Sequence, residues 1–231
     1  MAKHIGIVAC SAEGAALCYR TLCGEAQARM GEHMHPEVSM HTTPLGEYMP
    51  HIRSGDWDGV ANLMLGSAEK LVSIGAEILI CPDNTIHCAF YLVEKRSTVP
   101  WIHIADAVGK EAKQQGYSRI GVTGTKYLMA GSVYPKRLSP FGIVCEFPDE
   151  KDRERIDTII FRQLVNGIYT QESRRFFCEV LGKLQDRGCD AVALGGTEIP
   201  ILVDIRDCPL PVLDSTRLLA RAALERALED E

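Results

Sequence analysis

Short apolar runs alternate with amphipathic stretches along the whole chain. Apolar runs bounded by polar residues or glycine predict buried strands at 5–9, 38–40, 77–81, 101–104, 119–123, 143–145, 190–194 and 212–213. Apolar residues spaced three and four apart predict helices at 14–30, 58–74, 84–95, 152–167, 172–187 and 215–229, and 197–203 is a helical or loop segment. This alternation predicts an α/β fold, with parallel sheet covered by helices on both faces.

The two halves of the chain repeat one pattern. Ile5-Gly-Ile-Val opens the first half and Ile120-Gly-Val-Thr opens the second. Ile78, in a later strand, lies 73 residues after Ile5, and Val192 lies 72 residues after Ile120. Such spacings also arise by chance, but both later strands run into small polar residues, at 81–85 and 195–198. We therefore predict a duplication with two pseudo-symmetric α/β domains, 1–104 with 213–231 and 105–212.

This arrangement predicts a ligand cleft between the two domains. Ligands bind outside the carboxyl ends of parallel strands, where helix N-termini present unpaired N–H groups and the positive end of the helix dipole. Small donor residues occupy such positions in both halves: Ser11, Asn84, Thr85, Thr123, Thr125, Gly196 and Thr197. The predicted ligand is a small carboxylate.

Composition and charge narrow the classes of partner. The 231 residues are 46% apolar and 24% charged, as in an ordinary globular chain. A formal net charge of −6 without a basic block argues against a nucleic-acid partner. The apolar runs are shorter than the roughly 18 residues of a membrane span, and Glu13 comes too early for a signal peptide. We expect a protein that contacts neither nucleic acid nor membrane.

The cysteines and histidines point to a reduced, metal-free protein. The cysteines number nine and include no CxxC pair, which fits neither a disulfide framework nor a zinc site. Reduced thiols fit a cytoplasmic protein, in which most cysteines fill the core. His33, His35 and His41 lack the helical spacing of metal ligands.

Four segments resemble the cofactor-independent aspartate/glutamate racemase superfamily, which also holds hydantoin racemases, maleate isomerase and arylmalonate decarboxylase. Ile80-Cys-Pro-Asp-Asn-Thr-Ile-His87 is similar to the first signature of these proteins, and Leu194-Gly-Gly-Thr-Glu-Ile199 is similar to the second. Thr123-Gly-Thr125 with Tyr134, and the stretch from 147 to 167, follow the same pattern. The resemblance implies two pseudo-symmetric domains with the ligand between them, a homodimer, and chemistry without PLP or metal.

In these racemases two cysteines face opposite sides of the substrate α-carbon, because inversion requires proton removal and delivery on different faces. Donors around the substrate carboxylate then stabilise the enolate-like charge. This chain departs at both cysteine positions, which align with Asp83 and Gly196, and Cys81 lies two residues before Asp83 on the same strand face. His41 stands where aspartate-selective racemases often carry arginine.

The leading interpretation is a racemase or related isomerase that moves a proton α to a carboxylate. Asp83 would be the base, made stronger by burial, with Cys81 as a second catalytic candidate. The opposite-face donor is left open among Cys10, Glu198 and water. Asp83 would otherwise be only a helix N-cap, worth about 1 kcal/mol. The substrate carboxylate would be held by Ser11, Asn84, Thr85, Thr125, Tyr134, Gly196, Thr197 and Glu198.

Two other functions remain open at this stage. Loss of one base position also fits a one-sided lyase or cis–trans isomerase of a small dicarboxylate, in which a neutral aspartic acid delivers the proton. A chain that keeps the Asn-Thr and Thr-Glu segments without the two thiols also fits a non-catalytic carboxylate-binding protein.

Overall fold

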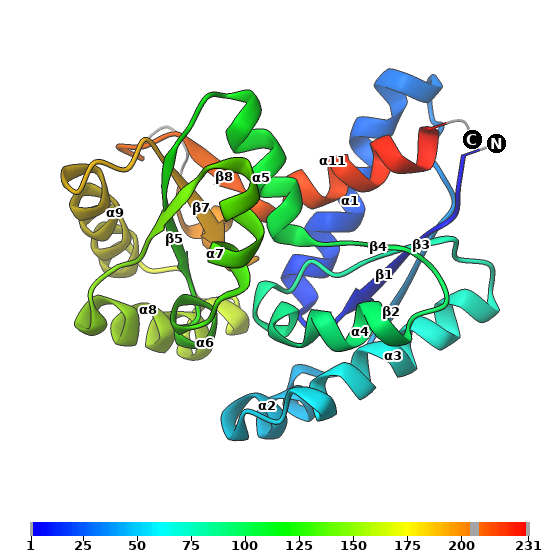
Figure 1. The fold of residues 1–231 in the computed structure, drawn as a ribbon, viewed down its shortest axis with the longest axis horizontal. Helices are drawn as coiled ribbons and strands as arrows, with labels where there is room; N and C mark the ends of the chain where they lie inside the picture. The colour runs from blue at the N-terminus through cyan, green and yellow to red at the C-terminus, as the bar shows by residue number, and fades with distance from the viewer. Residues whose placement is uncertain (1, 204–207, 230–231) are drawn as a thin grey trace. The chain divides into compact units, whose positions relative to one another are not determined.

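The structure is a computed structural model that describes residues 2–203 and 208–229 (Figure 1). The chain forms two compact units. The first comprises residues 1–104 with 216–231, and the second comprises residues 105–215. The chain passes from one unit to the other within helix α5 (Ile104–Gln114) and at the start of helix α11 (Ser215–Leu228).

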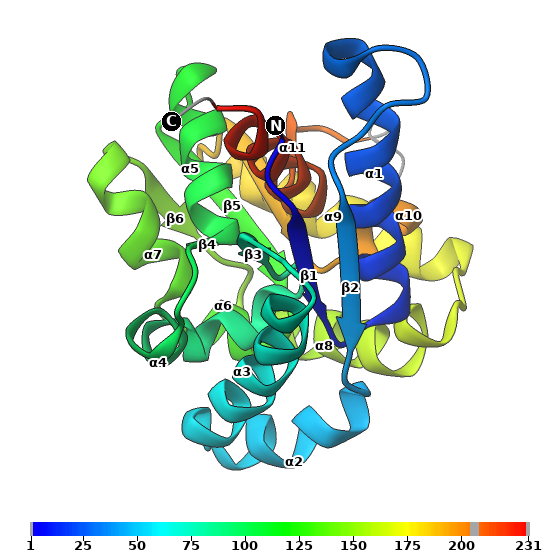
Figure 2. The same ribbon diagram turned by 90° about the vertical axis from the view of Figure 1, so that its right-hand side faces the viewer.

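The first unit contains a parallel sheet of four strands in the order β2-β1-β3-β4. Figure 2 shows β1 and β2 side by side, with α1 along them. The strands are β1 (Ile5–Ala9), β2 (Val38–Thr42), β3 (Ile78–Ile80) and β4 (Trp101–Ile102). The helices are α1 (Ala12–Met30), α2 (Leu45–Ser54), α3 (Trp57–Ser73), the 3₁₀ helix η1 (Asn84–Ala89), α4 (Phe90–Arg96) and most of α11.

Helices cover both faces of this sheet. Ile5, Ile7 and Ala9 of β1 pack in one buried cluster with residues of α1 and α11. Gly6, whose Cα substituent points to the opposite face, lies against Leu71 of α3. Because successive residues of a strand face opposite sides, β1 is apolar or glycine throughout and buried at every position.

The second unit repeats this sheet, in the order β6-β5-β7-β8 and again all parallel. Its strands are β5 (Arg119–Gly124), β6 (Val144–Glu146), β7 (Ala191–Gly195) and β8 (Val212–Asp214). Helices α8 (Glu150–Arg162), α9 (Gln171–Asp186) and α10 (Ile199–Leu202) share a buried cluster with β7. The remaining elements are α5, α6 (Lys126–Ala130), α7 (Val133–Leu138) and the 3₁₀ helices η2 (Ser139–Phe141) and η3 (Leu164–Asn166).

Equivalent glycines serve the same purpose in both sheets. A Cβ on Gly6 would lie 2.6 Å from Leu79 Cδ2 and 3.3 Å from Leu71 Cβ. A Cβ on Gly121 would lie 2.8 Å from Leu184 Cδ1 and 3.4 Å from Leu184 Cβ. In each unit, glycine lets the helix that precedes the third strand approach the first strand closely. The repeated Ile-Gly pair thus has a packing reason, and the shared sheet order supports the proposed duplication.

The α/β class and the parallel strands are confirmed, and the differences lie in the helices and one domain boundary. Helices α2, α5 and α6 were not predicted, and the segment around Tyr134 is the short helix α7. The predicted helix 84–95 is η1 followed by α4. The predicted helix 152–167 is α8 followed by η3, because Gln163 has non-helical backbone angles. The predicted boundary at 213 falls within β8, whose pairing with β7 places 213–215 in the second unit. Residues 1, 204–207 and 230–231 of the predicted domains lie outside the described residues.

Candidate active site

The carboxyl ends of β1 and β3 bring together the first group of predicted site residues. Because β1 and β3 are paired in parallel, the turn after β1 lies beside the segment after β3. The first holds Cys10 and Ser11, and the second holds the predicted candidates from residue 81 to residue 85. We call this set the first-unit cluster: Cys10, Ser11, Cys81, Asp83, Asn84 and Thr85. All except Thr85 are buried.

Asp83 faces the turn after β1 rather than its own helix. Its Oδ2 accepts a hydrogen bond from the backbone N–H of Cys10 at 3.0 Å, and Ser11 also donates to its carboxylate. The side chain makes no capping bond to η1, although Asp83 occupies the N-cap position. Helix capping therefore does not account for this carboxyl group.

Burial raises the pKa of Asp83, while its hydrogen bonds with Ser11 and Cys10 oppose that rise. Desolvation of the charged form is the larger effect, since the side chain is only 8% exposed. A carboxylate whose pKa lies above its usual range is a stronger base, which is the property expected of a proton-transfer group.

Cys81 is less suited to proton transfer than Asp83. It is fully buried, and its Sγ lies 3.9 Å from the carbonyl oxygen of Asp83, to which the thiol donates. Burial and then the neighbouring Asp83 carboxylate raise the thiol pKa well above its usual value. The thiol therefore stays protonated, and a thiolate at this position is disfavoured.

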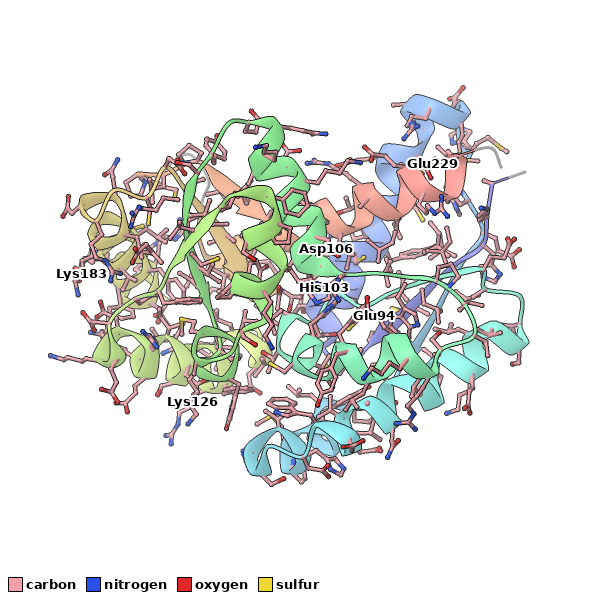
Figure 3. All side chains as sticks on the ribbon, viewed as in Figure 1. Glu94, His103, Asp106, Lys126, Lys183 and Glu229 are labelled. Carbon is pink, nitrogen blue, oxygen red and sulfur yellow. The ribbon has the colours of Figure 1, made fainter. Side chains whose placement is uncertain are left out.

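Aromatic side chains hold the segment that carries Asp83. His87 donates from Nε2 to the carbonyl oxygen of Cys81 at 2.9 Å. Its ring stacks on Phe90 with centroids 4.9 Å apart and meets His103, labelled in Figure 3, edge-on at 4.5 Å. His87 thus fixes the chain between β3 and η1.

His41 is engaged by α3. Lys70 Nζ donates to its Nε2 at 3.0 Å, so Nδ1 carries the proton of the neutral ring and donates to Ser67 Oγ at 2.9 Å. Burial, and then the charge of Lys70, lower the His41 pKa. A neutral histidine held in this way is a weak partner for a substrate carboxylate.

The second group of predicted site residues lies at the carboxyl ends of β5 and β7, where Gly124 pairs with Gly195. We call it the second-unit cluster: Thr125, Gly196, Thr197 and Glu198. Thr125 accepts from the N–H of Leu128 at 3.4 Å as the N-cap of α6. Thr197 and Glu198 are buried.

Tyr134 is directed elsewhere within the second unit. It is fully buried, and its hydroxyl forms a hydrogen bond with Ser215. Ser215 Oγ donates in turn to the carbonyl oxygen of Leu194 at 2.8 Å. Burial raises the Tyr134 pKa, which keeps the phenol neutral. These contacts join α7 to β7 and to the start of α11.

The family model described as Asp/Glu/hydantoin racemase matches residues 6–223. The chain belongs to this family. An Asp/Glu racemase candidate from Yersinia pestis is 33% identical, with a TM-score of 0.88 over 98% of this chain and 100% of the other. An aspartate racemase homologue from Pyrococcus horikoshii is 26% identical, with a TM-score of 0.83 over 99% and 100%. The aspartate racemase of Picrophilus torridus, at 18% identity and a TM-score of 0.79 over 97% and 94%, shares the fold.

Membership of the Asp/Glu/hydantoin racemase family supports an isomerase of the racemase type that uses no organic cofactor and acts on a small amino acid. Among the described residues, no group of three or more histidine, cysteine, aspartate or glutamate side chains is arranged to hold a metal ion. None of the described helices is both long and apolar enough to cross a membrane.

Gly196 has little room for the side chain that the resemblance places there. A Cβ at residue 196 would lie 2.8 Å from Ile199 Cδ1 and 3.1 Å from Ile199 Cγ1. The side chain of the first residue of α10 therefore fills the direction in which a cysteine would point. Gly196, which the resemblance aligns with the second cysteine, thus lies against the apolar side chain of Ile199.

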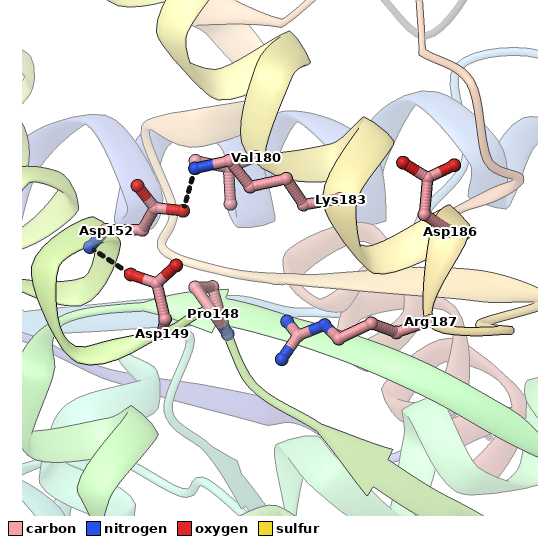
Figure 4. Close-up of a pocket in the computed structure, with 7 residues that line it drawn as sticks. All are labelled: Pro148, Asp149, Asp152, Val180, Lys183, Asp186 and Arg187. Carbon is pink, nitrogen blue, oxygen red and sulfur yellow. Dashed lines mark hydrogen bonds and ion pairs between the residues drawn. The ribbon is translucent and has the colours of Figure 1, made fainter.

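A separate pocket of about 310 Å³ lies between α8 and α9 of the second unit (Figure 4). Lys183 Nζ lies 2.7 Å from Asp152 Oδ2, and Asp149 accepts from the N–H of Asp152 at 2.9 Å. Arg187 donates to the carbonyl oxygen of Phe147 at 2.7 Å. The ion pair of Lys183 with Asp152 therefore links α9 to α8 beside this pocket.

Sequence reasoning missed Tyr48, a fully buried residue of α2 whose electrostatic neighbours are Cys10, Cys81 and Asp83. The sequence pattern that could have indicated its burial is weak. Tyr48 and Ile52 are the two buried residues of this ten-residue helix, and they stand four positions apart, on one helix face.

Proposed function

We propose that the protein is a PLP-independent racemase for a small amino acid of the aspartate/glutamate type, with Asp83 as one of its two proton-transfer groups. The observation that carries the proposal is the buried Asp83 carboxyl, which is held by Cys10 and Ser11 and has a raised pKa. By resemblance, Asp83 occupies the position of the first catalytic cysteine. A carboxylate there performs the same task as a thiolate, removal of the α-proton.

In the proposed reaction the Asp83 carboxylate accepts the α-proton, and the electron pair of the broken C–H bond moves into the substrate carboxylate. Hydrogen-bond donors stabilise the enolate-like charge that results. Asn84 and Thr85 of the first-unit cluster and Gly196 and Thr197 of the second are proposed as these donors. Ser11 and Thr125 would support them at their respective helix N-termini.

The second proton-transfer group is proposed to be Glu198. Gly196 has no side chain to move a proton, and Tyr134 is bonded to Ser215. Glu198 is then the titratable residue of the second-unit cluster, and it is buried. It would protonate the carbanion on the face opposite Asp83, so that one proton is removed and one delivered in each inversion.

The experiment is α-proton exchange in D₂O, followed by proton NMR, with L- and D-aspartate and L- and D-glutamate supplied separately. Wild-type protein should exchange both enantiomers of its substrate and interconvert them. Asp83→Asn should lose exchange of one enantiomer and all interconversion, while the remaining group still exchanges the other enantiomer without inversion. Glu198→Gln should show the opposite preference.

Asp58→Asn, a change at an exposed carboxylate of α3, is the matched control and should behave as wild type. Exchange of both enantiomers by Asp83→Asn would remove Asp83 from the mechanism. Decarboxylation of a malonate derivative, or exchange of one enantiomer by the wild-type protein, would replace the racemase by single-sided chemistry.

We further propose that the protein acts in the cytoplasm as a homodimer. The nine free cysteines support a reducing compartment, and the dimer is the assembly that the resemblance implies. Light scattering coupled to gel filtration measures the mass directly, and the proposed dimer is wrong if a 25.5 kDa particle is found.

A further inference from the structure

Helix α2 carries one fully buried tyrosine. The helix lies beside α3 (Figures 1 and 2) and buries Tyr48 and Ile52 on the face that they share. Tyr48 has no exposed surface, while Glu47 beside it is exposed. Tyr48 is therefore the main anchor of α2.

The hydroxyl of Tyr48 is a buried donor that no described residue pairs with. Among residues 2–203 and 208–229, no hydrogen-bond partner for its oxygen is found. An unpaired buried hydroxyl is costly, and a phenylalanine would fill the same space without that cost. Buried polar groups left unpaired call for an explanation, and binding of a ligand is one that can be tested.

The hydroxyl of Tyr48 lies near residues of the first-unit cluster. Its electrostatic neighbours are Cys81, Cys10 and Asp83 of the first-unit cluster, together with Glu47. Burial, and then the negative charge that these groups can carry, raise the Tyr48 pKa, so that the phenol keeps its proton and acts as a donor. The Asp83 carboxyl is already bonded to Cys10 and Ser11. The phenol proton is therefore free for a group that arrives with the ligand.

We propose that the Tyr48 hydroxyl is a substrate-binding group that donates a hydrogen bond to a carboxylate oxygen of the small acid bound by the first-unit cluster. This inference rests on the proposed function, because it names a contact within the same site. A carboxylate is the acceptor that fits. It satisfies a neutral phenol, and it is attracted to the N-terminus of the 19-residue helix α1, which begins directly after Cys10 and Ser11.

The test compares Tyr48→Phe with wild type in the full chain. Binding of L-aspartate, L-glutamate and malonate is measured by calorimetry, and the free energy of unfolding is measured without ligand. We expect the variant to be at least as stable as wild type, because it loses no hydrogen bond. We expect its affinity for the carboxylate that wild type binds to fall by about ten- to a hundred-fold, the range for a hydrogen bond to a charged group.

Steady-state kinetics give a second measurement, in which KM should rise more than kcat falls, because a binding contact made throughout the reaction is lost. Tyr91→Phe, at a tyrosine of α4 that is 53% exposed, is the matched control and should change neither stability nor affinity. An affinity within two-fold of wild type would overturn the proposal. So would a loss of ligand-free stability in Tyr48→Phe, since it would show that the hydroxyl is paired within the protein.

Failure of the racemase proposal is distinguishable from failure of this one. A wild-type protein that binds a carboxylate without exchanging its α-proton refutes the proposed reaction but leaves the affinity comparison intact. A wild-type protein that binds none of the three acids overturns the Tyr48 contact.

Discussion

The buried Asp83 carboxyl should make the protein less stable as the pH rises. Burial raises its pKa in the folded state above the value of about 3.9 that an unfolded aspartate has. The folded protein therefore holds this proton more tightly than the unfolded chain. The stabilisation is fully present below the unfolded pKa and is lost as the pH rises through the folded pKa.

Two substitutions separate the charge of Asp83 from its hydrogen bond. Asp83→Asn removes the titration but keeps an oxygen that accepts from the Cys10 N–H. Asp83→Ala removes both and leaves that buried N–H, now 3.0 Å from Asp83 Oδ2, without a partner. An unsatisfied buried donor costs about 1–3 kcal/mol, so the alanine variant should be less stable than the asparagine variant by that amount at every pH.

The assay is urea unfolding of all three proteins between about pH 4.5 and pH 8. The free energy of unfolding of Asp83→Asn should increase relative to that of wild type as the pH rises, because the variant has no carboxylate to desolvate. The gap between the two variants should stay constant with pH. The reasoning would be refuted if the free energy of unfolding of wild type increased relative to that of Asp83→Asn as the pH rises. Such a result would mean that the carboxylate is stabilised in the folded state.

Three substitutions in the second unit give further predictions. Gly121→Ala should destabilise the protein by about 1–3 kcal/mol, because the added Cβ meets the fully buried Leu184 at 2.8 Å. Gly182→Ala, on the same helix α9 with no atom within 4 Å of its added Cβ, should instead stabilise by about 0.5–1 kcal/mol, and urea unfolding measures both. Ser215→Ala should cost about 1–3 kcal/mol, because it leaves the buried carbonyl of Leu194 and the hydroxyl of Tyr134 without this partner. A Ser215→Ala midpoint equal to wild type in thermal denaturation would contradict that assignment.

The pattern of apolar positions was sufficient to predict the strands of both sheets, because parallel strands are buried on both faces. β1 was predicted with its bounds, and β5 to within one residue. Helix α5 was missed because small residues such as Ala105 and Ala112 are buried on it beside Ile104 and Val108, and because the predicted strand was extended to 104. Helix α2 was missed because it contains Pro50 and buries little.

The candidate site was predictable only as far as local sequence determines it. The residue types at 83–85 and 196–198 point to a carboxylate site, and the strand order brings each set to one edge of its sheet. The partners of Asp83 are 73 residues away in sequence at Cys10, and Ser215 lies 81 residues beyond Tyr134. No periodicity encodes such pairs, because they depend on which strands become neighbours.

The two clusters differ in the titratable side chains that they offer for proton transfer. Cys10, Cys81, Asp83 and Tyr48 lie together in the first unit. The pKa of Asp83 is set mainly by burial, which raises it, and by hydrogen bonds with Ser11 and Cys10, which lower it. A neighbouring lysine or arginine would lower that pKa and weaken the base.

The second unit instead offers backbone N–H groups at glycine and threonine, and Ile199 fills the direction in which a side chain at 196 would point. The first unit therefore holds the stronger candidate for proton transfer, and the second unit lacks a side chain at residue 196 for that role. Inversion requires a second proton-transfer group, and Glu198 is the residue of the second unit that we propose for this role. A racemase needs a proton-transfer group on each face of the α-carbon, and a second unit with no titratable group would limit the enzyme to exchange without inversion.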